Sequence, residues 1–449
     1  MPDAKALGAF VAGQRWFAAK TRRIVAVEVE DEVPVGDDRL IVAGVRLDDG
    51  ALDRYALPLR ASEMTVDALD REAYPLALWT VVARGAHVRG RRGELVGIPT
   101  AVFPTTVTLA TARRVGGEQS NTSLALGDTA LLKHFRRLAP GSNPDAEIAR
   151  FLTERAHFPH APRLLGQVEY RSGSGDTYTL AVIYDLVRES EDGWTFVLGE
   201  LERAFRAADL TAFLDAAEPA LAALQRLGDV TAALHLALAS DSRDPDFAPE
   251  TVTASDVARW RDAVRRQLAE AERVLAGTRL PDVSAVGDGL AALLGTTRIR
   301  HHGDFHLGQT LYRRARGEWF VIDFEGEPLR PIAERRQKHA PLRDVAGMLR
   351  SIDYAAVSAA PSPGDARARA FERAGAARYL TGYRRGTAGA PFAPATDDAF
   401  TRAVAAFVVE KAAYEIVYEA NHRPDWIRIP VDGLARAAIA ISERPAGAA

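Results

Sequence analysis

Residues 298–328 (RIRHHGDFHLGQTLYRRARGEWFVIDFEGEP) carry acidic and amide side chains at a spacing suited to phosphoryl transfer. Asp304 ends a His-Gly-Asp triplet, Gln309 comes five positions later, and Asp323 follows a short apolar run. Phosphoryl transfer needs an aspartate near the acceptor hydroxyl and oxygen ligands that hold Mg²⁺ against the nucleotide phosphates. The pattern H-x-D-x-x-x-x-(N/Q), with a second Asp at a strand end, supplies both.

The upstream part of the chain contains candidates for nucleotide contacts. Residues 116–123 (GGEQSNTS) lie between two strand-like runs and could fold over phosphates as a hairpin loop. They lack the spacing G-x-x-x-x-G-K-(S/T), which disfavours a P-loop NTPase. Lys133 lies one strand later, where a kinase-like lobe places the lysine that contacts the α- and β-phosphates. The further nucleotide candidates are Glu147 as a partner for Lys133, Ser120, Asn121 and Thr122 in the loop, and Ile183 and Asp185 in the segment 180–186 expected at the adenine.

These motifs resemble the catalytic and metal loops of the kinase-like phosphotransferases, a group that includes aminoglycoside phosphotransferases and choline kinases. Those enzymes carry H-G-D-x-H-x-x-N and I-D-W/F-E. A closer resemblance, to bacterial maltokinases and the similar actinobacterial glucosamine kinases, extends over the whole chain. It rests on residues 14–17, 302–309, 322–329, 334–336, 341–351 and 414–426. The resemblance implies a bilobal kinase fold and phosphorylation of a sugar that depends on ATP and Mg²⁺.

The resemblance also assigns roles. It implies that Asp304 orients the sugar hydroxyl and accepts its proton, and that Gln309 and Asp323 bind Mg²⁺. The metal and Lys133 would supply most of the catalysis through electrostatic stabilisation. The expected contacts to the sugar are Asp304, His306, Glu325, Glu415, Glu419 and Trp426. The simpler reading of the glutamates on the late helix is a solvated face.

The sugar acceptor is open between two candidates. We expect glucosamine, phosphorylated at its 6-hydroxyl, ahead of maltose, which would give maltose 1-phosphate. An aminosugar ammonium needs carboxylate partners, and Glu410, Glu415 and Glu419 share a predicted helix. Phe305, Thr310 and residues 337–339 also depart from the maltokinase pattern.

Three further residues have structural rather than chemical expectations. Arg343 and Asp344 could tie the catalytic and metal loops together, and we expect the simpler alternative, a structural ion pair, ahead of it. His235 lies in an apolar helical run, which predicts a hydrogen-bonded core histidine.

The order of the predicted elements indicates an α+β protein, because strands and helices are segregated along the chain. Alternating apolar residues predict strands over 24–33, 40–47, 55–60 and 177–187 and a hairpin over 86–97. Helical spacing covers 144–156 and most of the chain after residue 193, with a break expected at Pro219. The expected domains are a β-rich cap (1–98), a small nucleotide-binding lobe (99–192) and a helical lobe with the catalytic and metal loops (193–449).

Composition excludes several classes of protein. The 449 residues include 57 Lys+Arg and 60 Asp+Glu, a net charge of −3, which argues against a nucleic-acid binder. An apolar content of 47% argues against intrinsic disorder. Cysteine is absent, which removes disulfides and thiolate metal sites. With no signal peptide or membrane span visible, we expect a cytoplasmic protein, monomeric or a simple homodimer.

Two rival functions remain at this point. His301, His302 and His306 lie around Asp304 and could ligate zinc or manganese in a metallohydrolase, although an H-E-x-x-H motif is missing. A non-catalytic pseudokinase would be expected to lack the base or a metal ligand, and none of these is missing here.

Overall fold

The computed structural model describes residues 3–442 except residues 18, 117–119, 277–279 and 328–329. The chain forms two compact units: residues 1–188 with 330–334, and residues 189–329 with 335–449. Each unit has its own core and is described by itself. Within the described residues, every helix is too short or too polar to cross a lipid bilayer.

The first unit contains two antiparallel sheets. The smaller sheet has the order β1-β2-β3-β10, with β4 paired to β3. Its strands are β1 (Ile24–Val35), β2 (Asp38–Leu47), β3 (Leu52–Arg60), β4 (Glu63–Asp67) and β10 (Arg137–Leu138). Both faces of β2 are buried, because Leu40 belongs to one apolar cluster and Ile41 to the other. This explains its nearly continuous apolar sequence. Helix α1 (Ala4–Gly13) covers one face through Leu7 and Val11.

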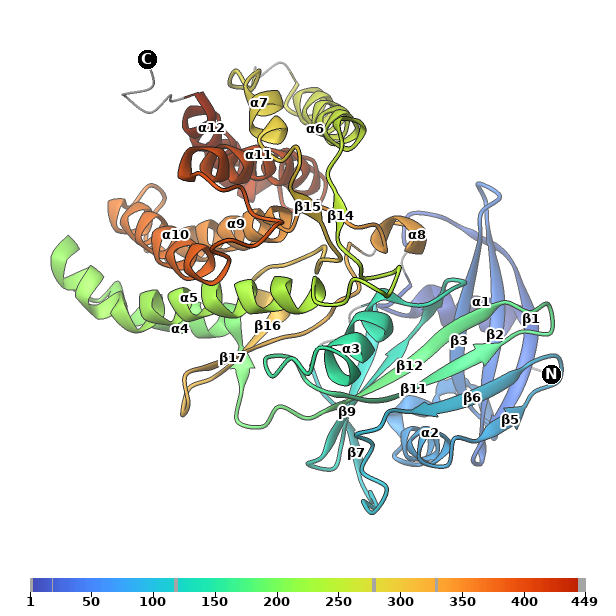
Figure 1. Cartoon of the computed structure of the whole chain (residues 1–449). Coiled ribbons are helices and arrows are strands. Elements are labelled where there is room, and N and C mark those ends of the chain that lie inside the picture. Colours follow the sequence, from blue (N-terminus) through green and yellow to red (C-terminus); the bar gives the residue numbers. More distant parts are fainter. Residues whose placement is uncertain (1–2, 18, 117–119, 277–279, 328–329, 443–449) are drawn as a thin grey trace. The chain divides into compact units, whose positions relative to one another are not determined.

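The larger sheet of this unit has seven strands in the order β5-β6-β11-β12-β9-β8-β7. They are β5 (His87–Arg89), β6 (Glu94–Pro99), β7 (Ala112–Arg114), β8 (Asn121–Leu126), β9 (Ala130–Phe135), β11 (Leu164–Arg171) and β12 (Thr177–Asp185). Helix α2 (Ala73–Ala83) packs on one face and α3 (Pro144–Glu154) on the other, as Figure 1 shows. The short helices η1 (Ala68–Asp70) and α8 (Ile332–Arg335) complete the list.

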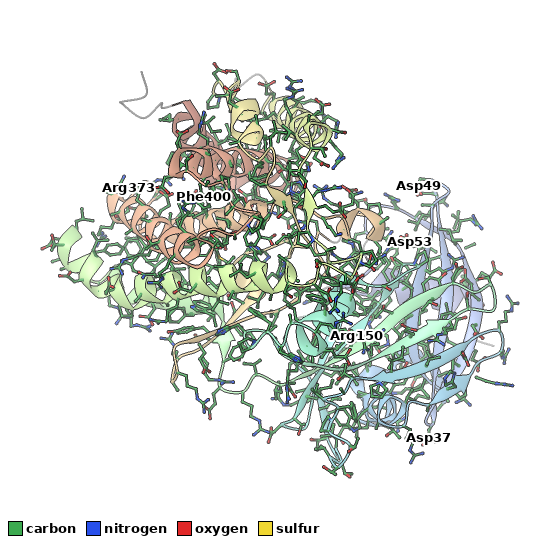
Figure 2. All side chains as sticks on the ribbon, viewed as in Figure 1. Asp37, Asp49, Asp53, Arg150, Arg373 and Phe400 are labelled. Carbon is green, nitrogen blue, oxygen red and sulfur yellow. The ribbon has the colours of Figure 1, made fainter. Side chains whose placement is uncertain are left out.

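The second unit is mainly helical, and its largest helices pack against one another (Figure 1). Its α-helices are α4 (Gly193–Ala204), α5 (Leu210–Leu238), α6 (Ala254–Val274), α7 (Val286–Ala291), α9 (Leu342–Ala359), α10 (Ala366–Gly386), α11 (Asp397–His422) and α12 (Arg428–Ser442). Aromatic contacts join them: Phe400 of α11, labelled in Figure 2, lies 6.1 Å from the ring of Tyr383 of α10.

Two small sheets lie among these helices. The first has the order β13-β16-β17, with β13 (Glu191–Asp192), β16 (Thr310–Arg313) and β17 (Glu318–Val321); the second pairs β14 (Glu250–Thr251) with β15 (Thr297–Arg298). Two 3₁₀ turns, η2 (Leu307–Gln309) and η3 (Pro424–Trp426), flank β16 and α12 respectively. The β16–β17 hairpin is the frame of the catalytic segment, because Gln309 precedes it and Asp323 follows it.

The α+β class, the added N-terminal cap and the helical second half are confirmed, but several elements differ from expectation. The break expected at Pro219 is wrong, since α5 runs through this residue. Pro219 and Asp215 are both exposed, so water can reach the carbonyl that proline leaves unpaired. Helices α2 and α9 were not predicted at all. The α2 sequence AYPLALWTVVA is apolar almost throughout, because the helix is largely buried, and it therefore lacks helical periodicity.

Close packing between α5 and α10 depends on glycines, which gives a stability prediction. A Cβ at Gly228 would lie 2.1 Å from the backbone oxygen of Tyr379, so Gly228→Ala must separate the helices. We expect the substitution to lower the free energy of unfolding by about 1–3 kcal/mol. The control is Gly199→Ala in α4, where the added atom meets only a flexible Arg203 tip at 4.0 Å and should be neutral or stabilising. Thermal unfolding of both variants checks this; equal melting temperatures would contradict the packing argument.

Candidate active site

The catalytic loop is held to the metal loop by His302. Its Nε2–H donates to the carbonyl oxygen of Ile322 at 2.9 Å, and its Nδ1 lies 3.4 Å from the backbone N–H of Asp304. Because a carbonyl can only accept, Nε2 carries the proton and Nδ1 is the acceptor. Both ring nitrogens therefore contact backbone groups, and His302 has no nitrogen left to ligate a metal. The metallohydrolase hypothesis needed it as a metal ligand.

Asp344, at the start of α9, anchors the same loop from the other side. Its side chain is buried and accepts the backbone N–H groups of His302 at 2.7 Å and Gly303 at 2.9 Å. His235 Nε2 lies 3.2 Å from the same carboxylate. Burial alone would raise the pKa of Asp344, but the neighbouring His301 and His235 outweigh it and hold that pKa below the ordinary aspartate value. The loop backbone therefore rests on an ionised, charge-assisted acceptor.

The expected ion pair between Arg343 and Asp344 is replaced by different contacts. Arg343 lies 3.6 Å from Glu327 and 3.4 Å from Glu410, while Asp344 binds the loop. Consecutive residues at a helix start point in different directions, so adjacency in sequence did not make them partners. The prediction for His235 is confirmed: it is fully buried, and its Nδ1 lies 2.9 Å from the hydroxyl of Tyr383.

Asp304 keeps about a quarter of its side chain exposed and has a cationic neighbour that the sequence reasoning missed. Lys411 Nζ, from α11, lies 3.3 Å from Asp304 Oδ1 and 3.6 Å from Glu327 Oε1. Burial would lower the pKa of Lys411, but these two carboxylates outweigh it and raise that pKa above the ordinary lysine value. Lys411 therefore stays charged beside the expected catalytic base. The available signal was its position four residues before Glu415, on the same helix face.

The expected Mg²⁺ ligands lie at the same end of the β16–β17 hairpin. The Ile322 N–H donates to the Gln309 carbonyl at 3.0 Å, so the residues before β16 and after β17 are hydrogen-bonded neighbours. Asp323 has a φ of 65°, a left-handed conformation that is uncommon for a residue with a side chain and clusters at functional sites. Carboxylate and amide oxygens are the donors that Mg²⁺ prefers. The two residues therefore fit a magnesium ion by donor type and by local arrangement.

Two other predicted residues lie in or after these loops. His306 caps η2, since its Nδ1 accepts the Gly308 N–H at 3.1 Å, and burial lowers its pKa below the ordinary histidine value. Its side chain is thus a neutral imidazole at neutral pH. The backbone carbonyl oxygen of Glu325 accepts from Arg335 Nη1 at 2.9 Å, and the Glu325 carboxylate lies 3.8 Å from the same guanidinium.

The carboxylates of α11 do not form a solvated face. Glu415 accepts from Arg350 at 2.8 Å, and Glu419, almost fully buried, accepts from the Tyr354 hydroxyl at 3.0 Å and from Arg423 at 2.7 Å. Burial raises the pKa of Glu415 above the ordinary value although Arg350 opposes it. Along the helix axis, Glu415 lies about 6 Å and Glu419 about 12 Å from Lys411. Glu415 therefore lies one turn, and Glu419 two turns, beyond the lysine that contacts Asp304.

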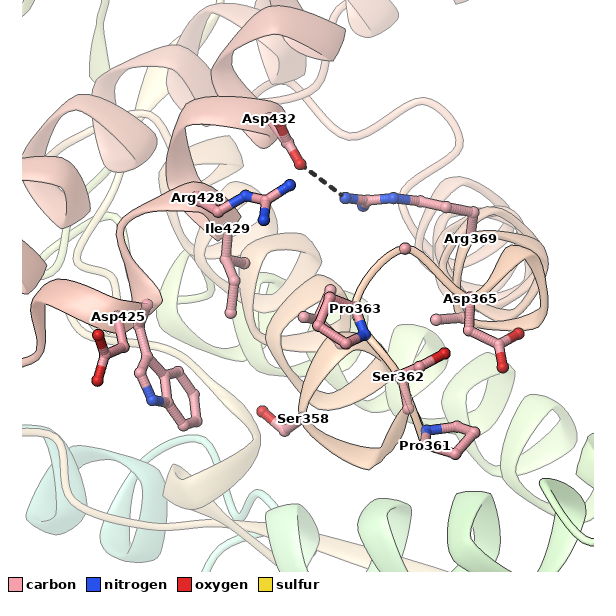
Figure 3. Close-up of a pocket in the computed structure, with 15 residues that line it drawn as sticks. Ser358, Pro361, Ser362, Pro363, Asp365, Arg369, Asp425, Arg428, Ile429 and Asp432 are labelled. Atoms are coloured by element: carbon pink, nitrogen blue, oxygen red, sulfur yellow. Dashed lines mark hydrogen bonds and ion pairs between the residues drawn. The ribbon is translucent and has the colours of Figure 1, made fainter.

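Trp426 lines a separate pocket of about 340 Å³ at the ends of α9, α10 and α12 (Figure 3). One ring face packs on Tyr354, with ring centroids 6.1 Å apart. An ion pair between Arg369 and Asp432, 3.4 Å apart, closes one side of the pocket in Figure 3. Among the residues that line it, none belongs to the loops of Asp304 or Asp323. The expected stacking of Trp426 on the sugar stays a prediction.

In the first unit, Lys133 of β9 has a defined acidic partner. Its Nζ lies 2.9 Å from Asp145 Oδ2, in the first turn of α3, and Asp145 is almost fully buried. The sequence reasoning named Glu147, two residues later and half-buried on the same helix. Asn143 caps the helix by accepting the Asp145 N–H at 2.9 Å, which orients that first turn. Asp145 is therefore the partner to add, and the role of Glu147 stays a prediction.

The strand register shows that the residues predicted to contact the nucleotide lie on two opposite faces of the larger sheet. Ser123 and Val182 pair with Lys133 and share its face, on which α3 packs. Thr122 and Ile183 point to the opposite face: Thr122 accepts from Arg136 at 2.9 Å, and Ile183 is fully buried in the cluster around α2. Their side chains are therefore unavailable on the lysine face, and any contact would use their backbone.

The remaining predicted nucleotide residues lie at strand ends. Ser120 is exposed, Asn121 starts β8, and Asp185 ends β12, where its carboxylate accepts from Arg163 at 2.5 Å. Residues 117–119 of the predicted loop lie outside the described residues.

Comparison with known proteins identifies the family. Residues 10–88 match the maltokinase N-terminal cap domain, and residues 111–379, more than half of the chain, match the phosphotransferase enzyme family. The chain belongs to this phosphotransferase family. It is a sugar kinase with a kinase-like fold and an N-terminal cap, as the sequence predicted.

Named relatives support the same assignment. A glucosamine kinase from Streptacidiphilus jiangxiensis is 30% identical over 325 residues, which is 70% of either chain. A solved glucosamine kinase structure, crystal form B, superposes with a TM-score of 0.70 at 25% identity, over 97% of this chain and 99% of the other. A second, in complex with glucosamine, ADP and inorganic phosphate, has a TM-score of 0.67 at 24% identity over 97% and 99%.

The first test of the site is Asp304→Asn. The amide cannot accept a proton, so we expect kcat to fall by about 10²–10⁴-fold, the usual contribution of a general base. Binding of ADP should change little, because the amide keeps the size of the side chain. Coupled ATP-consumption kinetics and calorimetry measure the two effects. A kcat near that of the native enzyme would remove Asp304 from its role.

A second test concerns the anchor of the loop. Asp344→Asn replaces one acceptor oxygen with a donor that meets a backbone N–H, so we expect a loss of about 1–3 kcal/mol of stability. The control is Asp397→Asn in the first turn of α11, a 92% exposed side chain. Because the folded pKa of Asp344 is depressed, the difference should be complete above about pH 5 and shrink as the pH falls below the ordinary carboxyl value of about 3.9. Urea unfolding from pH 7 downwards measures it; a difference that grows on acidification would contradict the assignment.

Proposed function

We propose that the enzyme transfers the γ-phosphate of ATP to the 6-hydroxyl of glucosamine. The observation that carries the proposal is Asp304: a partly exposed carboxylate on a loop whose backbone is held by Asp344 and His302. Such a carboxylate can orient an acceptor hydroxyl and take its proton as the bond to phosphorus forms. The ammonium of Lys411, 3.3 Å from Asp304 Oδ1, limits the rotation of this carboxylate.

Gln309 and Asp323 would hold Mg²⁺, which supplies charge neutralisation at the phosphates when it is bound. The protein's own contribution is to orient these oxygens. The hydrogen bond between Ile322 and Gln309 and the left-handed backbone of Asp323 do so before any metal arrives. Gln309 takes the place of the commoner asparagine and provides the same carbonyl donor on a longer arm.

Lys133 would contact the α- and β-phosphates, with Asp145 holding its ammonium in place. A buried carboxylate 2.9 Å from the ammonium fixes the position of this flexible side chain before ATP binds. The entropic cost of ordering Lys133 when the nucleotide binds is therefore smaller. We assign Ser120 and Asn121, at the start of β8, to the phosphates, and the backbone of residues 180–186 to the adenine.

Glucosamine is favoured by the names of the relatives and by the carboxylates near Asp304. Glu327 contacts the same lysine as Asp304, and Glu415 is a buried carboxylate whose pKa is raised. A cation that approached Glu415 would relieve part of its burial cost, which is the chemistry that an aminosugar ammonium offers. His306, Glu325, Glu419 and Trp426 remain candidates for further sugar contacts.

Maltose, phosphorylated at its anomeric hydroxyl, is the second candidate, and one observation favours it. Lys411 already places an ammonium beside Asp304, and each of Glu410, Glu415 and Glu419 has a guanidinium within 3.4 Å. A neutral sugar needs no free carboxylate and meets no repulsion from Lys411.

The test is ATP consumption with glucosamine, glucose and maltose as acceptors. Glucose is the matched control, because it differs from glucosamine only by a hydroxyl in place of the amine. We expect glucosamine to exceed glucose in kcat/KM by about 30-fold, the ratio that about 2 kcal/mol of charge-assisted hydrogen bonding gives. Phosphorus NMR of the product identifies the phosphorylated hydroxyl. A preference for maltose would establish the second candidate, and consumption with none of these sugars would reject both.

A further inference from the structure

One buried carboxylate of the cap, Asp67, is linked to two neighbouring strands, to β7 through Arg114 and to β8 through Arg136. Asp67 ends β4 and is 6% exposed. Its Oδ2 accepts from Arg114 Nη2 at 3.1 Å, and Arg114 is the last residue of β7. The same oxygen accepts from Arg136 Nη2 at 2.5 Å. All of these residues belong to the first unit.

Arg136 carries the connection to the second strand. It is fully buried, and its Nε donates to Thr122 Oγ1 at 2.9 Å; Thr122 is the second residue of β8. The Ala56 N–H of β3 donates to the Arg136 carbonyl at 2.8 Å, and the guanidinium lies 5.1 Å from the ring of Trp16. Arg136 is therefore fixed by cap residues on several sides, and Thr122 is tied to it.

The Asp67 side chain is itself held rigidly. Its Oδ1 accepts the Leu69 N–H at 2.9 Å and so caps η1. Asp70, at the end of that turn, lies 2.7 Å from Arg114 Nε and adds a second, more exposed contact. A carboxylate with one oxygen bound by a helix start and the other by two guanidinium groups has little freedom to move.

The connection crosses from one family module to the other. Asp67 lies in the segment that matches the cap domain, and Arg114 and Arg136 lie in the segment that matches the phosphotransferase family. Thr122 lies on the face of the sheet opposite Lys133. The contacts of Asp67 and Arg136 therefore fix the position of β8 from the face that does not carry the lysine. They reach the strand ends without occupying the lysine face.

We propose that Asp67 is a positioning residue for ATP: by holding the end of β7 and the start of β8, it sets where Ser120 and Asn121 meet the nucleotide phosphates. The cap thereby takes part in nucleotide binding through the sheet, without contacting ATP. This inference rests on the proposed function, because it needs Ser120 and Asn121, at the start of β8, to contact the nucleotide phosphates.

The experiment compares Asp67→Asn with a matched control at the same junction. Asp53 of β3, labelled in Figure 2, pairs with Arg137 of β10 at 2.6 Å and also joins the two modules, but it contacts neither β7 nor β8. We expect Asp67→Asn to lower kcat/KM for ATP by about 10- to 100-fold, as displaced positioning groups do, with KM for the sugar changed by less than about twofold. Asp53→Asn should leave both constants unchanged. The Kd for ADP, measured by calorimetry, should rise in Asp67→Asn and stay unchanged in Asp53→Asn.

A milder variant guards against loss of folding. Arg114→Gln removes the tether to β7 and keeps the buried pair of Asp67 and Arg136, and Arg114 is partly exposed, so this variant should fold. It should show the same selective rise in the Kd for ADP and in KM for ATP. Unchanged nucleotide constants in a folded Asp67→Asn or Arg114→Gln enzyme would overturn the inference. Native enzyme that fails to bind ADP would instead reject the proposed function.

Discussion

The catalytic segment depends on one buried acceptor, the carboxylate of Asp344. A loop that exposes Asp304 must leave backbone N–H groups without strand or helix partners, and a buried N–H without an acceptor is costly. Asp344 provides that acceptor from the first turn of α9, where the helix dipole also favours a negative charge. His235 and Tyr383 extend the arrangement into the core, so the position of the loop is set by the packing of three helices.

Around Asp304, charges alternate rather than accumulate. Asp304 and Glu327 share Lys411, and Glu327 and Glu410 share Arg343. Each carboxylate thus has a cation, and each cation is bound by more than one carboxylate. Such a chain of ion pairs fixes side chains that would otherwise be flexible. The same alternation restricts which sugar can bind next to Asp304, because the sugar must fit between side chains whose charges are already paired.

Local features were predictable from the sequence and distant partners were not. The order of His302, Asp304, Gln309 and Asp323 is a local pattern, and the β16–β17 hairpin between Gln309 and Asp323 is short, so the sequence could predict that these residues are neighbours. Lys411 reaches Asp304 from a helix more than a hundred residues later, and its position one turn before Glu415 indicates a shared helix face but not the contact with Asp304. Asp145 contacts Lys133 because the start of α3, set by Asn143 and Pro144, turns this residue toward the lysine, and the sequence pattern did not reveal where that helix begins. Helix α2 was not predictable because it is buried on most sides, and its sequence therefore lacks the alternation of apolar and polar residues that marks a helix.

The left-handed backbone conformation of Asp323 restricts which amino acids can occupy this position. A φ of 65° is tolerated by glycine, asparagine and aspartate, whose side chains are absent or short and polar, and is costly for most others. Glutamate would keep the charge but would strain the chain, and glycine would relax the chain but lose the oxygen. Of these residues, aspartate alone combines the tolerated left-handed backbone with a charged oxygen donor.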